Sequence, residues 1–392
     1  MPRFLSSALA VCITLTIGFF GTALPAFAQA PPSITIRKTD SVNISNKGIT
    51  GANGAEINQI LSQDLKIAGC FAESDAARAS YTISGQSGGS QLQGTIKDNR
   101  GNSILTKSYS GNARSLAHQF ADDIVETLTD NVGIATSKIA FVSNRTGQKE
   151  VYLADYDGAN VRQLTRDRAI SVAPALSPDG RNLAYTGYQS GYADIYTVSL
   201  GDGARKRVVK FPGTNSGAAW SPDSARIALS VSRDGNPELY VVGSNGRGAR
   251  RLTRTRGTES SPTWGPGGKE IIYVSDDRGG PALYRISSGG GKGTPVPTGY
   301  GYNTEPHWSP DGEKLAFVVR SGGFSVASKN LRSGQTKIVA GGAVDPAWAP
   351  NSRHLIYASS SGSSLVILDT KTGKTYPVVS GLGQVSEPSW AR

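Results

Sequence analysis

The heptapeptide Pro306-His-Trp-Ser-Pro-Asp-Gly312 decides the fold of this chain, because copies of it recur along the second two thirds of the sequence. All five tryptophans of the chain occupy the same column of this repeat, at Trp220, Trp264, Trp308, Trp348 and Trp390. A sixth copy, Pro174-Ala-Leu-Ser-Pro-Asp-Gly180, carries Leu176 in that column. The spacing of 40 to 44 residues is typical of a four-stranded propeller blade. Because one blade cannot bury its own faces, the repeat predicts blades stacked around an axis.

Each repeat predicts four strands in a fixed order. A short inner strand around Pro-x-Trp is followed by a Ser-Pro-Asp-Gly turn, a second strand such as Leu183-Ala-Tyr185, and a third such as Asp194-Ile-Tyr196. At the start of the region, Ile139-Ala-Phe141 is a second strand without an inner strand before it, and Pro388-Ser-Trp390 is an inner strand with nothing after it. Pairing these two strands would remove two exposed edges. Residues 135–392 are therefore predicted to form a closed, all-β propeller of six blades.

The preceding segment, residues 29–134, reads as a small α/β domain with a flexible N-terminal arm. Ile57, Ile60, Leu61 and Leu65 share one helical face that ends at Gly69. A second apolar face, from Leu116 to Leu128, predicts a helix that stops at Gly133. Three strand-like runs lie between them, at 79–85, 92–97 and 103–109. The Gly-rich and Asn-rich stretch 46–54 is expected to be a loop.

The first 28 residues have the pattern of a signal peptide. Arg3 precedes an uncharged apolar run from Phe4 to Leu24, and Pro25-Ala-Phe-Ala28 offers small residues where a signal peptidase cuts. Cleavage after Ala28 would export the protein and leave no transmembrane segment. An uncleaved membrane anchor is the alternative, because the apolar run approaches spanning length. Gln29 follows the expected cut, so no cysteine is placed there for lipid attachment.

Charge and cysteine content narrow the class of protein. The formal net charge of +11 favours acidic partners. The basic residues are not interleaved with aromatic ones, as they are in many proteins that bind nucleic acid, so no nucleic-acid partner is expected. Loss of the leader would remove Cys12 and leave Cys70 alone, which excludes a disulfide framework. Cys70 is expected to be a small buried hydrophobe.

The sequence offers few residues for catalysis or for binding a metal. Its three histidines, His118, His307 and His354, are far apart, and no Gly-x-Ser-x-Gly nucleophile motif is present. The stretch 289–294 departs from a phosphate-binding loop, and 155–160 lacks the closing Glu of a calcium loop, so both are expected to be hairpins. We therefore expect no enzyme activity, no cofactor and no metal site.

The two ends of the repeat differ in how much they vary. Asp179, Asp223 and Asp311 recur in the Ser-Pro-Asp turns, where an Asp can bond its own backbone. The residues just before each Pro-x-Trp are not copies of one another: they run 214–216, 258–261, 303–305, 343–345 and 385–387. Variable tips on a repeated scaffold are typical of a binding face, although ordinary loop variation is the alternative.

The whole chain after the leader resembles the TolB family of the Tol–Pal envelope system. The resemblance is carried by the repeat Pro-x-Trp-Ser-Pro-Asp-Gly-x-x-Leu-Ala-Phe, by 152–158, by the helical stretch Glu56 to Leu65, and by the junction from Phe120 to Val142. The repeats alone are weakly specific, because propellers attached to peptidases share them. The N-terminal domain makes the resemblance specific, although this domain is shorter than in most of the family.

The resemblance implies a non-catalytic, monomeric adaptor in the periplasm. In this family the channel face of the propeller binds the peptidoglycan-associated lipoprotein Pal, and the N-terminal arm binds the inner-membrane protein TolA. It thereby supports outer-membrane integrity, protein transport and envelope constriction at cell division. The implied channel-face residues are Thr214, Asn215, Glu259, Ser261, Asn303, Thr304, Glu305, His307, Asp345 and Glu387. The implied arm residues are Ser33, Ile34, Thr35, Ile36 and Arg37.

Two other functions stay open at this point. An exported propeller enzyme, such as a hydrolase or lyase, would need clustered His, Glu or metal ligands, and His307 with Glu305 is the one hint of such a cluster. A propeller that binds peptidoglycan or another glycan through its positive charge would bind much more weakly at high salt.

Overall fold

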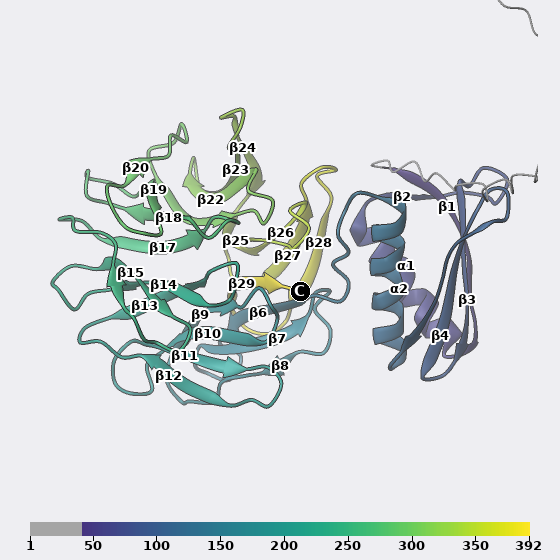
Figure 1. Ribbon diagram of the computed structural model, residues 1–392, viewed down its shortest axis with the longest axis horizontal. Coiled ribbons are helices and arrows are strands. Elements are labelled where there is room, and N and C mark those ends of the chain that lie inside the picture. The colour runs from purple at the N-terminus through teal and green to yellow at the C-terminus, as the bar shows by residue number, and fades with distance from the viewer. Residues whose placement is uncertain (1–40) are drawn as a thin grey trace, which may run out of the picture. The chain divides into compact units, whose positions relative to one another are not determined.

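Residues 41–392 are described by the computed structural model, and the leader and the N-terminal arm lie outside them. The first part of the described chain is a five-stranded sheet in the order β2-β1-β3-β4-β5, with two helices against it (Figure 1). The strands are β1 (Val42–Ala52), β2 (Phe71–Glu73), β3 (Tyr81–Gly88), β4 (Gln91–Asp98) and β5 (Ser103–Ser110). The helices are α1 (Gly54–Ala68) and α2 (Ala113–Leu128), which pack against each other.

Both predicted helices form, and their apolar faces are buried. Ile57 and Leu61 of α1 and Phe120 of α2 have no exposed surface. Helix α1 ends as expected, because Gly69 takes a left-handed backbone with φ of 67°. Helix α2 ends at Leu128 instead of Gly133, and the hydroxyl of Thr129 donates to the carbonyl oxygen of Val125 at that end.

The expectation of a loop at residues 46–54 is wrong, because β1 covers most of this stretch. Strand β1 pairs in parallel with β2 on one side and with β3 on the other. The register shifts between Asn46 and Gly48, and Gly48 and Gly51 have φ of 88° and 87°. Glycine tolerates this bulged backbone. Burial of Ile44 and Ile49 and pairing on both edges therefore override the local composition.

The rest of the described chain forms six four-stranded sheets around a common axis (Figure 1). Blade 1 contains β9 (Ser171–Leu176), β10 (Asn182–Gly187), β11 (Asp194–Ser199) and β12 (Arg205–Val209). Blade 2 contains β13 (Asn215–Trp220), β14 (Arg226–Val231), β15 (Glu238–Gly243) and β16 (Arg250–Arg251). Blade 3 contains β17 (Glu259–Trp264), β18 (Glu270–Ser275), β19 (Ala282–Ser287) and β20 (Thr294–Pro295).

Blade 4 contains β21 (Asn303–Trp308), β22 (Lys314–Arg320), β23 (Phe324–Asn330) and β24 (Thr336–Gly341). Blade 5 contains β25 (Ala343–Trp348), β26 (His354–Ser359), β27 (Ser364–Asp369) and β28 (Thr375–Ser380). Blade 6 is built from both ends of the region, with β29 (Val385–Ala391) beside β6 (Lys138–Ser143), β7 (Glu150–Asp155) and β8 (Arg162–Gln163). Strand β29 pairs antiparallel with β6, so the predicted closure of a six-bladed ring is confirmed.

The tryptophan column joins neighbouring blades. The indole N–H of Trp220 donates to the carbonyl oxygen of Ala175 in blade 1 at 2.9 Å. That of Trp264 donates to the carbonyl oxygen of Ala219 in blade 2 at 3.0 Å. The indole ring also fills the apolar layer between two sheets, and Trp220, for example, is only 8% exposed. At Trp220 and Trp264 the indole therefore serves packing and a hydrogen bond to the preceding blade together. Trp308 instead donates within its own blade, to Gly312 O at 3.2 Å, and Trp348 serves packing.

The Ser-Pro-Asp turns are structural, as their position in the repeat predicted. The Asp179 carboxylate accepts from the backbone N–H of Arg181 at 3.1 Å and from the hydroxyl of Ser177 at 2.5 Å. Asp311 is bonded in the same way by Glu313 N–H and Ser309. Within residues 41–392, no helix is both long enough and apolar enough to cross a membrane.

Candidate functional site

The channel-mouth face is the end of the propeller where the six inner strands begin. Two kinds of segment form it: the loops that join the second strand of a blade to the third, and the connections that lead into each inner strand. Backbone hydrogen bonds join them, since Ser232 N–H donates to Thr214 O at 3.0 Å and Ser360 N–H donates to Gly342 O at 2.8 Å. The variable tips of the sequence repeat therefore do converge on one end of the ring.

One residue of each inner strand has a left-handed backbone. These residues are Ala173, Gly217, Ser261, Glu305, Asp345 and Glu387, with φ between 49° and 65°. The strand register shifts at each of them, so the inner strands share a bulge at the same level of the channel. A left-handed backbone is costly for residues other than glycine. Bulges of this kind re-aim a side chain, and here they recur around the whole ring.

Three of the bulge residues are acidic and bond around the ring from blade to blade. Glu305 accepts from Asp345 N–H at 2.7 Å, Asp345 accepts from Glu387 N–H at 2.9 Å, and Glu387 accepts from Ala173 N–H. Burial, together with the charge of Asp345, raises the pKa of Glu305 to about 8. Burial raises the pKa of Glu387 as well. The three carboxyl groups thus hold four adjacent blades together and share less than three negative charges at neutral pH.

His307 also serves the contact between blades. Its Nδ1 accepts from the backbone N–H of Trp348 at 3.2 Å. The hydroxyl of Thr263 fills the same role for Trp308 in the preceding blade, at 3.1 Å. Burial lowers the pKa of His307 to about 4, so the ring is neutral at physiological pH. His307 and Glu305, the one hint of a catalytic cluster, are therefore each engaged in a bond that joins two blades.

Three residues implied by the resemblance are buried inside their blades instead of lying at the surface. Asn215 and Glu259 have no exposed surface, and Asn303 is 3% exposed. The Asn215 amide donates to Phe211 O at 2.8 Å, and the Asn303 amide donates to Tyr300 O at 2.8 Å. Each therefore fixes the connection that enters its inner strand. The expectation that they are accessible tips is corrected, because the two asparagine amides bond local backbone carbonyls and the Glu259 carboxylate accepts from neighbouring hydroxyls.

Glu259, which the resemblance implies as a partner contact, is held inside blade 3 by two hydroxyl groups. Its carboxylate accepts from the hydroxyls of Thr255 and Ser275, at 2.7 and 2.8 Å. Burial raises the pKa of Glu259 to about 7, even though these two hydroxyls act in the opposite direction. Of the other channel-face residues, Thr214 is exposed, and the remaining ones are half-buried: Ser261, Thr304, Glu305, His307, Asp345 and Glu387. The arm residues Ser33, Ile34, Thr35, Ile36 and Arg37 lie outside the described residues.

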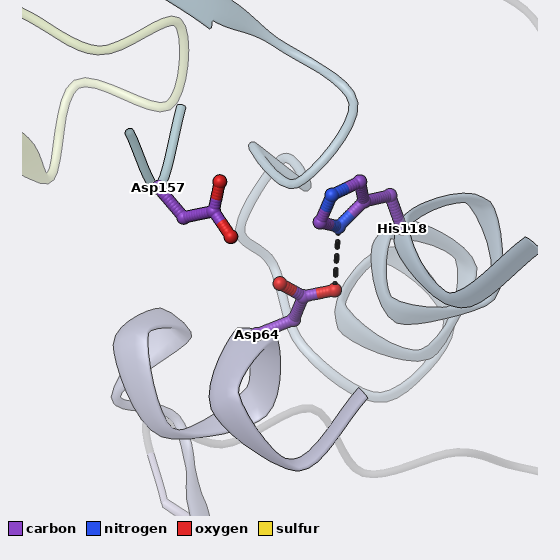
Figure 2. A group of neighbouring side chains, drawn as sticks. All are labelled: Asp64, His118 and Asp157. Atoms are coloured by element: carbon purple, nitrogen blue, oxygen red, sulfur yellow. Dashed lines mark hydrogen bonds and ion pairs between the residues drawn. The ribbon is translucent and has the colours of Figure 1, made fainter. Parts of the chain in front are cut away.

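A second polar cluster lies where α1 and α2 meet the β7–β8 hairpin. Figure 2 shows its two carboxylates and one imidazole, those of Asp64, Asp157 and His118. Nδ1 of His118 in α2 lies 2.8 Å from a carboxylate oxygen of Asp64 in α1. The hydroxyl of Tyr156 donates to the other oxygen of Asp64 at 2.7 Å. Asp157 points toward this pair from the hairpin (Figure 2). Burial raises the pKa of Asp64, and burial beside Asp64 raises that of Tyr156.

The donor atoms of this cluster could in principle hold a metal ion, because one ligand atom from each of Asp64, His118 and Asp157 lies within 4.8 Å of the others. The neighbouring cations argue against it. Arg114 forms ion pairs with Asp157 and, at 2.7 Å, with Asp155. Lys138 is paired with Asp155 as well. A metal would have to compete with the Arg114 guanidinium for Asp157, so the arrangement fits an ion-pair network between helices and hairpin.

Residues of blade 5 satisfy the carbonyl groups at the end of α1. Tyr376 donates to Lys66 O at 3.0 Å, and His354 Nε2 lies 2.9 Å from Ile67 O. Arg353 donates to Gly69 O at 2.8 Å and is held by Asp369, with 3% and 0% of the two side chains exposed. The last carbonyls of a helix have no partner within it. The propeller therefore caps α1, and the structural interpretation of His354 is confirmed.

Sequence reasoning missed both of these contacts. The residues of each contact come from segments more than 50 positions apart, as with Asp64 and His118 or Ile67 and His354. No local spacing signals such a pair. The Asp155-Tyr-Asp157 stretch was recognised as a hairpin, and the structure bears this out because Gly158 N–H donates to Asp155 O.

The opposite end of the channel is a funnel of about 440 Å³ lined by apolar side chains. Its wall consists of the prolines and tryptophans of the repeat, including Trp220, Trp264 and Trp308. The carboxy-terminal Arg392 lies in the same wall. Because the repeat itself builds this wall, its composition follows from blade packing.

A search of protein families finds that residues 125–392 match the model described as the TolB beta propeller domain. Among curated proteins, a TolB homolog from Chlorobaculum tepidum is 42% identical over 113 residues, which is 28% of this chain and 26% of that protein. The Tol-Pal system protein TolB of Syntrophotalea carbinolica is 32% identical over 188 residues, which is 40% of this chain and 44% of that protein. These alignments thus span less than half of each relative.

The comparison of structures extends over nearly the whole chain. The crystal structure of TolB from Acinetobacter baumannii matches with a TM-score of 0.80 and 26% sequence identity. The match covers 92% of this chain and 98% of that one. The α/β part and the propeller therefore occur together, in this order, in a solved protein.

Proposed function

Because this chain belongs to the TolB family of β-propeller proteins, we propose that it is a non-catalytic, periplasmic adaptor of the Tol–Pal system. A Pal-like lipoprotein domain would bind the channel-mouth face, and a TolA-like inner-membrane protein would bind the N-terminal arm. Through these partners it would support outer-membrane integrity, protein transport and envelope constriction at cell division. The observation that supports the proposal most strongly is the likeness to the Acinetobacter TolB structure over 92% of the chain.

The geometry of the channel supports a binding role over a catalytic one. Glu305 and His307, the residues that could have served chemistry, accept hydrogen bonds that join adjacent blades. A general base must reach a proton of its substrate, whereas these acceptor atoms are engaged with backbone N–H groups. A rigid scaffold with variable loops is instead suited to recognition of another protein.

Calorimetric titration with the Pal-like periplasmic domain of the same cell tests the first half of the proposal. We expect micromolar or tighter binding by the chain without its leader. Thr214→Arg and Thr304→Arg place a long side chain on the channel mouth without disturbing a buried group, and each should weaken binding at least about 10-fold. Thr294→Arg, on the exposed outer strand of blade 3, is the control and should bind like the wild type.

The outcomes of this titration separate function from site. Absence of any binding by the wild type would refute the adaptor proposal. Binding that both channel-mouth variants retain would move the contact to another surface. Glu259→Arg is unsuitable for this purpose, because a charge introduced at a position with 0% exposure would disrupt the blade.

Deletion of residues 29–38 tests the second half of the proposal. The shortened chain should lose binding to the TolA-like domain and keep binding to the Pal-like domain. If the two sites are coupled, a saturating amount of one partner must change the affinity for the other, and the factor must be the same in both directions. Unchanged TolA-like binding after the deletion would exclude the arm as the contact.

A further inference from the structure

Charged residues are unevenly distributed on the channel-mouth face. The loops and connections 144–149, 164–170, 210–214, 232–237, 252–258 and 276–281 carry nine Arg or Lys residues and four Asp residues. These segments belong to blades 6, 1, 2 and 3. The segments on the side of blades 4 and 5, at 296–302, 321–323, 342, 360–363 and 381–384, carry no charged residue, and the exposed Arg320 at the end of β22 is the one basic residue that borders them. We refer to the nine basic residues on the charged side as the basic crescent.

Most positive charges of the crescent face solvent, whereas its acids are engaged locally. Arg233 is an exception, because it forms an ion pair with Asp234 at 3.6 Å. Arg145, Lys149, Arg166 and Arg168 are all exposed, and none forms an ion pair with another residue in 41–392. The acids instead support their own loops. Asp277, for example, accepts from the backbone N–H of Arg256 at 3.0 Å. The crescent thus presents a net positive surface to a partner.

The acidic residues inside the channel do not cancel this surface. The carboxyl groups of Glu305, Asp345 and Glu387 each accept from a backbone N–H of the next blade. With a pKa of about 8, Glu305 is mostly protonated at neutral pH. The three carboxyl groups therefore carry fewer than three negative charges at neutral pH, which is less than the excess of five positive charges on the crescent segments (nine Arg or Lys against four Asp).

An exposed apolar cluster lies within the crescent, on the loops of blade 1. Ile170, Tyr188 and Tyr192 are 43%, 39% and 70% exposed. The backbone N–H of Tyr188 donates to Ile170 O at 2.9 Å, so the two loops that carry these residues lie side by side. Tyr192 follows four residues after Tyr188 on the same loop. Exposed tyrosines beside arginines are the composition of energetically important positions in protein interfaces.

We propose that the partner on the channel-mouth face is a folded protein with an acidic surface, which docks on the basic crescent and covers Ile170, Tyr188 and Tyr192. The inference rests on the proposed function and adds the chemistry of the partner and the side of the ring that it occupies. A polyanion or an anionic lipid surface would need the positive charge alone. The apolar cluster in the middle of the charge favours a folded protein, because a protein can bury it.

The salt dependence of binding, measured with matched variants, tests this proposal. The probe is the Pal-like domain, titrated at about 50 mM and about 500 mM NaCl. Arg166→Glu/Arg168→Glu should bind about 10-fold more weakly than wild type at low salt and less than about 3-fold more weakly at high salt. Tyr192→Ala should bind about 10-fold more weakly at both salt concentrations, because it removes apolar contact.

The control for charge is Lys337→Glu/Lys374→Glu, which makes the same change of net charge at exposed positions outside the channel-mouth loops. It should bind the domain like the wild type. Equal behaviour of the two charge-reversal variants at both salt concentrations would overturn the inference while leaving the proposed function intact. Failure of the wild type to bind would overturn both.

A second probe distinguishes a membrane from a protein. Vesicles that contain phosphatidylglycerol should not bind the wild type more tightly than they bind Arg166→Glu/Arg168→Glu. Vesicle binding that this variant loses, with unchanged affinity for the Pal-like domain, would assign the crescent to a lipid surface and overturn the inference.

Discussion

Removal of the Arg353 guanidinium should strongly destabilise the protein, because it leaves a buried carboxylate without its counter-charge. Arg353 donates to both oxygens of Asp369, at 3.0 and 2.7 Å, and to Gly69 O at 2.8 Å. The side chains are 3% and 0% exposed. Loss of one partner of a buried ion pair costs about 3–5 kcal/mol. Arg353→Met, which keeps most of the apolar stem, should therefore lower the free energy of unfolding by about that amount.

The pKa of Asp369 reflects the same stabilisation by Arg353. Burial alone would raise this pKa, but the bonds from Arg353 and Thr372 hold it at about 2. Compared with an ordinary value of 3.8, the shift corresponds to about 2 kcal/mol at neutral pH. Because the folded-state pKa is the lower one, this stability is present above about pH 4 and is lost as the pH falls toward 2.

Equilibrium unfolding in urea is the assay. Tryptophan fluorescence follows the propeller, which contains all five tryptophans, and far-UV circular dichroism includes the signal of α1 and α2. The double variant Arg353→Met/Asp369→Asn should be more stable than Arg353→Met, because it leaves no buried charge behind. Lys374→Met, an exposed change in the neighbouring β27–β28 hairpin, should stay within about 0.5 kcal/mol of wild type.

The reasoning would be refuted by a particular pattern of these stabilities. A cost below about 1 kcal/mol for Arg353→Met would show that Asp369 is not stabilised by this pair. A double variant that is as unstable as Arg353→Met would show that the cost comes from lost packing or lost capping of α1, and not from the unpaired charge.

Three further predictions concern stability. Trp220→Phe should cost about 1–2 kcal/mol more than Trp348→Phe, as measured by urea unfolding, because the Trp220 indole donates to Ala175 O whereas that of Trp348 has no hydrogen-bond partner within residues 41–392. His354 has a pKa lowered to about 4 by burial, so it should destabilise the fold progressively as the pH falls from about 6.5 to about 4. His354→Gln should reduce this pH dependence in thermal melts, and an unchanged slope would contradict the assignment. Glu305 should change stability with pH in the opposite direction, because its pKa is raised to about 8. The stability that its protonated form contributes is lost as the pH rises from about 4.5 through 8. Between pH 5 and pH 8, the free energy of unfolding of Glu305→Gln should therefore rise by about 1–3 kcal/mol relative to that of the wild type. A constant difference across that range would exclude this explanation.

The parts of the fold that sequence could predict are those in which one local pattern repeats. Trp264 and its equivalents mark each inner strand, and the unpaired Ile139–Phe141 and Pro388–Trp390 segments predicted closure of the ring. The stretch 46–54 was mispredicted because glycine and asparagine are rare in strands. Pairing of β1 on both edges, with Gly48 at the register shift, decides its structure, and pairing between distant strands is not visible in composition.

The candidate site was only partly predictable for a related reason. The sequence placed Glu259 and Thr214 at the same end of the ring, and the structure agrees. Sequence could not tell which of them faces solvent, because one position along a strand separates a buried side chain from an exposed one. The contacts of Asp64 with His118 and Tyr156 depend on how α1, α2 and the hairpin pack, and no spacing in the sequence encodes that.

The shared sixth blade has a consequence for how the chain reaches its folded state. Strand β6 precedes blade 1, but its neighbour β29 is the last strand of the sequence, and the Ser143 hydroxyl donates to Leu382 O across 239 positions. A chain that emerges from its amino terminus holds the edge of β6 open until residues 385–391 have been synthesised. Pairing over such a separation is slow, because loop closure precedes any gain from contacts. Products that stop before residue 385 would therefore keep two unpaired sheet edges and associate with one another.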